Sequence, residues 1–137
     1  MKSLEELDIR SDLVYTKTHE WAQKTGNTVR VGVDDYAQNA LGDIVYVELP
    51  AAGAAVNAGA AFGSLESTKA VSDLNSPVTG KVTAVNETLV DSPEKVNTSP
   101  YEEGWIIEVE PAEPGELDGL MKNDAYRAFL KTLAPVE

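Results

Sequence analysis

Apolar and polar residues alternate along much of the first two thirds of the chain, which is the pattern of β-strands. In residues 28–33, Val29, Val31 and Val33 alternate with polar or small residues directly after the turn signal Thr25-Gly26-Asn27. Because successive side chains of a strand point to opposite faces, this segment predicts one arm of a half-buried hairpin.

Other short apolar runs that end near Gly, Pro or Asn predict further strands. They cover residues 14–17, 20–23, 44–49, 62–68, 71–75, 81–85 and 104–110. Residues 51–61 are expected to form loops with Val56 as a single apolar anchor, and the stretch that ends at Pro100 is expected to be rich in turns. A short helix is predicted over 35–41, with Asp34 as its N-cap and Gly42 as its stop. The fold class is therefore mainly β.

The hydrophobic period changes near the C-terminus, and this marks a helical segment over 115–133. Its apolar stripe recurs at i, i+3, i+4 and i+7 and consists of Tyr126, Phe129, Leu130 and Leu133. Residues 1–13 are charged and aperiodic apart from a weak stripe of leucine and isoleucine. We predict that they form a loosely held extension, and that 14–137 form one domain.

The net charge of the chain restricts the classes of molecule that it can bind. The 137 residues include 23 Asp and Glu against 11 Lys and Arg, so the formal net charge is −12. Such a field repels phosphate backbones and anionic lipids but attracts basic protein surfaces, so we expect neither nucleic-acid nor membrane binding. The N-terminus has no signal or transit pattern, and no apolar run approaches membrane-spanning length, so a cytoplasmic protein of bacterial type is expected. We also expect it to be a monomer.

The residues that usually carry chemistry are nearly absent. The chain has no Cys, which excludes disulfides and thiolate chemistry of its own, and its single His19 leaves no multi-His metal centre. We therefore predict no catalytic residue and no metal site. His19 is expected to be structural, and Asp34-Asp35 is interpreted as a helix cap rather than as a metal ligand pair.

One lysine is isolated from all other basic residues. Lys69 is the only basic residue between Arg30 and Lys81, and it lies at the turn of the hairpin predicted from 62–68 and 71–75. Lysine and alanine gain nothing from turn geometry, so a tip without Gly, Asn or Pro is unusual. From charge pattern alone, an exposed solubilising lysine remains the plainer interpretation.

The sequence around this lysine resembles a known family. Residues 66–73, Glu-Ser-Thr-Lys-Ala-Val-Ser-Asp, are similar to the lipoyl-lysine hairpin of lipoate-bearing carrier domains. Their surroundings resemble the H protein family of the glycine cleavage system, in segments 18–21, 31–38, 41–50, 75–80 and 100–105. The likeness runs from about Val14 to Leu133, and these segments in this order are highly specific.

The resemblance implies a fold, a prosthetic group and a set of site residues. The fold would be a lipoyl/biotinyl-type flattened barrel, a β-sandwich hybrid, with lipoic acid in amide linkage to Lys69. Enzymes that attach lipoate would recognise hairpin residues Glu66, Ser67, Thr68, Ala70 and Asp73. The loaded arm would fold back into a cleft formed by Thr18, Glu20 and Asp73. Serine is common in the family where Thr18 stands, and threonine keeps the hydroxyl.

The resemblance also implies a carrier rather than an enzyme. Its arm would take the aminomethyl group of glycine from the pyridoxal-phosphate-dependent P protein to the tetrahydrofolate-dependent aminomethyltransferase, the T protein. The dithiol would then be reoxidised by dihydrolipoamide dehydrogenase, the L protein. A prosthetic group that brings its own sulfur explains how a chain without cysteine takes part in disulfide chemistry.

The residues leave four alternatives to an H protein open: three other kinds of carrier and a small enzyme. Biotinyl domains usually flank their lysine with methionines, where this chain has Thr68 and Ala70. Lipoyl domains of 2-oxo acid dehydrogenases share the Lys-Ala pair but are shorter. A divergent H-like lipoyl carrier, serving lipoate relay or sulfur metabolism, would keep the fold and the lysine. A small enzyme using His19 with Glu20 or Asp73 would need no partner proteins.

Overall fold

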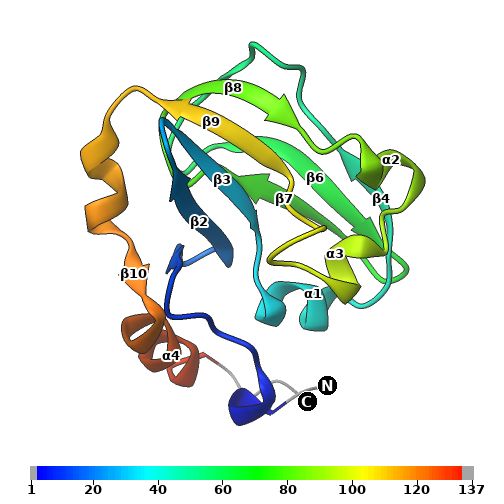
Figure 1. Cartoon of the computed structure of the whole chain (residues 1–137). Helices are drawn as coiled ribbons and strands as arrows, with labels where there is room; N and C mark the ends of the chain where they lie inside the picture. The colour runs from blue at the N-terminus through cyan, green and yellow to red at the C-terminus, as the bar shows by residue number, and fades with distance from the viewer. Residues whose placement is uncertain (1–2, 134–137) are drawn as a thin grey trace.

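A computed structural model describes residues 3–133, and Figure 1 shows two antiparallel β-sheets with short helices at their margins. The larger sheet has seven strands in the order β10-β1-β2-β3-β9-β8-β5, and the smaller has three in the order β4-β6-β7. The mainly β, flattened-barrel fold expected from the sequence is confirmed.

Most strands lie where alternation predicts them. The strands are β1 (Val14–Tyr15), β2 (Glu20–Thr25), β3 (Thr28–Val33), β4 (Ile44–Glu48), β5 (Ala55–Val56), β6 (Ala61–Ser67), β7 (Val71–Asn75), β8 (Gly80–Val85), β9 (Ile107–Pro111) and β10 (Met121–Lys122). The helices are η1 (Leu4–Glu6), α1 (Asp35–Leu41), α2 (Thr88–Asp91), α3 (Lys95–Thr98), η2 (Pro114–Gly119) and α4 (Asn123–Lys131). The predicted strand over 14–17 is shortened to two residues, and the strand expected over 104–110 begins at Ile107.

The main core lies between the two sheets. The alternating valines of β3, Val29, Val31 and Val33, are buried there together with Leu65 and Leu74 of the β6–β7 hairpin. Burial of this apolar surface is the main force that holds the small sheet against the large one. The hairpin is thus anchored on its inner face and leaves its tip at the rim.

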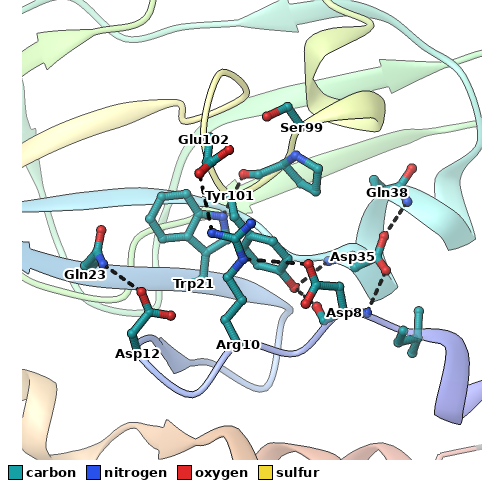
Figure 2. Close-up of polar contacts among 12 residues, drawn as sticks. Asp8, Arg10, Asp12, Trp21, Gln23, Asp35, Gln38, Ser99, Tyr101 and Glu102 are labelled. Carbon is teal, nitrogen blue, oxygen red and sulfur yellow. Dashed lines mark hydrogen bonds and ion pairs between the residues drawn. The ribbon is translucent and has the colours of Figure 1, made fainter.

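The N-terminal segment differs from the expected loose extension. Three of its apolar side chains are buried in a second core cluster beside α4, namely Leu7, Ile9 and Leu13. Figure 2 shows the backbone between them tied to the domain: Asp8 N donates to Asp35 Oδ2 over 2.9 Å, and Tyr101 OH donates to Asp8 O. The expectation of a loose extension is wrong for residues 7–13. Their apolar side chains form no helical stripe in the sequence, but they are buried in this cluster. Residues 1–2 lie outside the described part.

The helical predictions hold in part. α1 begins and ends as expected, since Asp34 Oδ1 accepts from Ala37 N over 2.8 Å and Gly42 follows the last turn with φ 79° and ψ −158°. In α4, Tyr126 and Leu130 are buried as the stripe predicted. The helical segment 115–133 is, however, interrupted by β10, which pairs with β1.

Candidate functional site

The tip of the β6–β7 hairpin consists of three exposed residues, 68–70, with Lys69 in the middle. The Ser67 hydroxyl accepts hydrogen bonds from Lys69 N and Ala70 N, each over 3.1 Å, and Ser67 N donates to Ala70 O over 2.8 Å. A serine side chain that bonds nearby backbone in this way stabilises a turn. Ser67 therefore replaces the glycine or asparagine that the tip lacks.

A second contact holds the tip from outside. Thr68 N donates to Asp43 O over 3.1 Å, in the linker between α1 and β4. The Lys69 side chain lies along the same linker, because a Cβ added at Gly42 would be 3.0 Å from Lys69 Cε and 3.8 Å from Nζ. Lys69 forms no ion pair with any residue in 3–133. The Lys69 amine is therefore exposed and has no ion-pair partner among the described residues.

The outer face of the small sheet carries the predicted recognition residues of the hairpin. Glu66 pairs with Tyr46 of β4 on one side and with Val71 of β7 on the other, and Asp73 lies in the next row opposite Ser64. Ser64 and Glu66 are two residues apart on β6 and therefore lie on the same face of the sheet. Asp73 pairs with Ser64, so it shares this face with Glu66, and both acidic side chains are exposed. Thr68 and Ala70 are exposed as well, while Ser67 is buried in its turn-forming contacts.

Glu20 and Thr18 meet beside the far end of β7. Glu20 is only 1% exposed; its Oε1 accepts from Thr16 Oγ1 over 2.8 Å and from Thr18 Oγ1. Its Oε2 accepts from Asn75 N over 3.1 Å, which ties the start of β2 to the end of β7. The structure therefore brings Thr18 and Glu20 together. Within the described residues Asp73 bonds to neither, but it lies two positions before Asn75 on the same strand.

The environment of Glu20 favours a cationic neighbour. Burial raises the pKa of the Glu20 carboxyl, and the hydrogen bonds from Thr18, Thr16 and Asn75 N offset part of that shift. No Lys or Arg forms a salt bridge with it in the described part of the chain. A buried carboxylate without a counter-charge is costly, so an ammonium group placed beside it would be held strongly.

His19 lies in a packed environment. Its Nδ1 is 2.6 Å from Tyr126 OH, and its ring centroid is 4.4 Å from that of Tyr36. Burial lowers the His19 pKa to about 4. Tyr126 OH also donates to Asp34 Oδ2, so the histidine takes part in the contact between α4 and α1. These contacts agree with the predicted structural role.

Sequence reasoning missed the polar residues that connect distant segments at this site. Thr16 and the backbone of Asn75 complete the surroundings of Glu20, and Asn97 of α3 bonds to the α1–β4 linker. These partners are separated by up to 55 residues, and no local pattern marks them. Among residues 3–133, no group of three or more His, Cys, Asp or Glu side chains could hold a metal ion. None of the helices described there is long and apolar enough to cross a membrane.

Comparison with known proteins gives consistent matches. The family model described as "Glycine cleavage H-protein" matches residues 13–133. The chain is 56% identical over 124 residues to the glycine cleavage system H protein of Myxococcus xanthus (strain DK1622), covering 90% of this chain and 96% of that relative. It is 53% identical over 121 residues to the mitochondrial H protein 2 of Arabidopsis thaliana, covering 88% and 78%.

A solved structure agrees with the sequence matches. The crystal structure of a glycine cleavage system H protein from Mycobacterium marinum superposes with a TM-score of 0.81 at 39% identity, covering 91% of this chain and 100% of that one. The family model spans the hairpin, the α1–β4 linker and the segment that contains Glu20. The chain therefore belongs to the glycine cleavage system H protein family.

Proposed function

We propose that this chain is the lipoyl carrier of a glycine cleavage system, with lipoic acid attached to Lys69. The observation that carries the proposal is the exposed, unpaired Lys69 at a tip shaped by Ser67, in a chain of this family. The bound group would supply the disulfide that accepts the aminomethyl unit of glycine and is later recovered as a dithiol. The residues present fit that group, since a lysine on a flexible four-carbon stem gives both reach and an amine for a stable amide.

The hairpin residues would serve the attachment reaction. Glu66, Thr68 and Ala70 surround the lysine and are exposed, and Asp73 extends the same acidic face. An enzyme that attaches lipoate can therefore reach the backbone and side chains on both sides of Lys69. Ser67 contributes by keeping the tip in one conformation.

We expect the cationic cargo to be held beside the end of β7. Glu20 offers a buried carboxylate without a counter-charge, Thr18 adds a hydroxyl bonded to it, and Asp73 lies along the strand that leads there from Lys69. Opposite charges attract more strongly where water is excluded, so these groups favour an ammonium group over a neutral one.

The chain would supply no catalytic residue and would work through its partners. These are the P protein, the T protein, the L protein and the lipoate-attaching enzymes, which meet it in the cytoplasm. The net charge of −12 favours partners with basic surfaces around their active-site entrances. Residues 14–137 would act as a single carrier domain, present as a monomer.

Replacing the lysine tests the assignment. Lys69→Arg keeps the charge but cannot form the amide, so it should carry no lipoyl mass and support no glycine–bicarbonate exchange with a P protein. Lys81→Arg, the same change on β8, should leave both at the wild-type level. Exchange by the Lys69→Arg protein at the wild-type rate would refute the carrier function, and turnover by the purified chain alone would indicate an enzyme instead.

The proposed cargo site has its own test. Glu20→Gln keeps the shape and removes the negative charge. In the absence of partners, water should therefore hydrolyse the aminomethyl unit to formaldehyde and ammonia several-fold faster, leaving the free dithiol. Glu48→Gln, on the exposed face of β4, serves as the matched control and should not change the release rate. Equal release rates for the two variants would show that Glu20 does not hold the cargo.

A further inference from the structure

Asn97 lies outside the predicted site, yet its side-chain amide is fully used at the α1–β4 linker. Its Nδ2 donates to Gly42 O over 2.9 Å and to Gln38 Oε1 over 3.1 Å, and its Oδ1 accepts from Ile44 N over 2.9 Å. One side chain on α3 thus bonds to the residue that follows α1, to the last turn of α1 and to the first residue of β4. It fixes the linker on both sides of Asp43.

The linker in turn contacts the arm at two points. Asp43 O accepts from Thr68 N over 3.1 Å, and the methylene stem of Lys69 lies against Gly42. Gly42 leaves room for that stem because it has no Cβ, and its φ of 79° with ψ −158° belongs to a region used almost only by glycine. The linker is therefore the surface from which the arm leaves the domain.

We propose that Asn97 is a positioning residue for the lysine arm, acting through the Gly42–Ile44 linker. This inference rests on the proposed attachment of lipoate to Lys69. Without the Asn97 amide, Gly42 O and Ile44 N lose their side-chain partner, and Asp43 O is no longer held opposite Thr68 N. The tip then moves relative to the domain, although the turn made by Ser67 stays intact.

The chain offers a matched control. Asn86 is also an asparagine whose Nδ2 donates two hydrogen bonds, to Glu103 O over 2.8 Å and to Trp105 O over 2.7 Å. It fastens the same connection between β8 and β9 that carries α3, but it has no hydrogen bond to the linker. Asn86→Ala therefore reproduces the general loosening expected of Asn97→Ala without its specific effect on the arm.

The first measurement is hydrogen exchange in the unmodified protein. In Asn97→Ala the Thr68 amide should exchange about tenfold faster, as expected when one hydrogen bond is weakened by its usual net contribution. The amides of the β2–β3 hairpin should keep their wild-type rates. In Asn86→Ala the Thr68 rate should remain within about twofold of wild type, because Asp43 is still fixed.

The second measurement is acylation of Lys69 by an ATP-dependent lipoate–protein ligase. Lys69 Nζ attacks the carbonyl carbon of lipoyl-AMP, the bond from that carbon to the phosphate oxygen breaks, AMP leaves, and Nζ releases a proton to solvent. Asn97→Ala should lower kcat about tenfold with KM within about twofold, because docking is kept while the amine is displaced. A merely structural role would leave kcat at the level of Asn86→Ala.

Asn97→Asp keeps the bond to Ile44 N and the volume of the side chain, and loses the donors to Gly42 O and Gln38. It replaces Asn97→Ala if that protein does not fold, with the same selective effects expected. Equal Thr68 exchange and equal kcat in the Asn97 and Asn86 variants overturn the positioning role. If the wild-type protein accepts no lipoyl group, the proposed function fails, while hydrogen exchange still decides whether Asn97 fixes the tip.

Discussion

The hydroxyl of Tyr126 is a buried polar link between the C-terminal helix and the rest of the domain. The side chain is fully buried, its OH donates to Asp34 Oδ2, and His19 Nδ1 lies 2.6 Å away. Tyr126→Phe removes only this oxygen. The ring, stacked on Tyr15 with centroids 4.6 Å apart and planes within 5°, stays in place.

The cost follows from the groups that lose a partner. A hydrogen bond between uncharged groups contributes about 0.5–1.5 kcal/mol, and a buried polar group left without a partner costs about 1–3 kcal/mol. Because Asp34 keeps its bond from Ala37 N, we expect a total loss of about 3 kcal/mol. In a domain of this size that corresponds to a fall in Tm of roughly 10 °C.

Urea unfolding at pH 7 measures the effect. The midpoint should fall while the m-value stays unchanged, because the surface exposed on unfolding is the same. Tyr46→Phe is the matched control, since Tyr46 is 54% exposed on β4, and its loss of stability should stay below about 0.5 kcal/mol. If Tyr126→Phe costs no more than this control, the hydroxyl does not anchor α4 and the argument fails.

Two further changes test the packing and the charge of the interior. Burial raises the pKa of Asp34 from 3.8 to about 8, so the folded state keeps a proton that the unfolded state releases, and stability falls as pH rises through this window. Asp34→Asn cannot titrate, so its stability relative to wild type should improve by on the order of 4 kcal/mol between pH 5 and 8. An unchanged difference would contradict the assignment. A Cβ at Gly32 would lie 2.6 Å from Trp21 Nε1, so Gly32→Ala should lower the free energy of unfolding by about 1–3 kcal/mol, measured by thermal unfolding. Gly115→Ala is the control and should leave the stability unchanged, because a Cβ there would have no atom within 4 Å.

Local pattern was sufficient for the elements that bury one face. Val29, Val31 and Val33 alternate because β3 faces the core, and α1 was bounded by Asp34 and Gly42 because helix ends need a side-chain acceptor and a left-handed residue. Tyr126 and Leu130 were predicted to pack because a helix returns to the same face every three to four residues. Such signals lie within one element and need no knowledge of the fold.

The remaining features depend on contacts between distant segments. β5 has only two residues, and α2 and α3 have four each, which is too short for a period to develop. The buried state of Glu20 depends on Asn75, 55 residues away, and the linker depends on Asn97, 53 residues from Ile44. The resemblance to the family marked Thr18 and Glu20 as partners, but neither polarity nor spacing showed that Glu20 would be buried.

The two outer strands of the small sheet share a property that bears on how the protein behaves at high concentration. Outward-facing N–H groups of an edge strand can pair with another chain and start aggregation. Here Ile44 N of β4 is occupied by Asn97 Oδ1, and Asn75 N of β7 is occupied by Glu20 Oε2. Side-chain oxygens thus take the place of a neighbouring strand at one position on each edge, which hinders edge-to-edge association of a carrier that has to stay free to diffuse between enzymes.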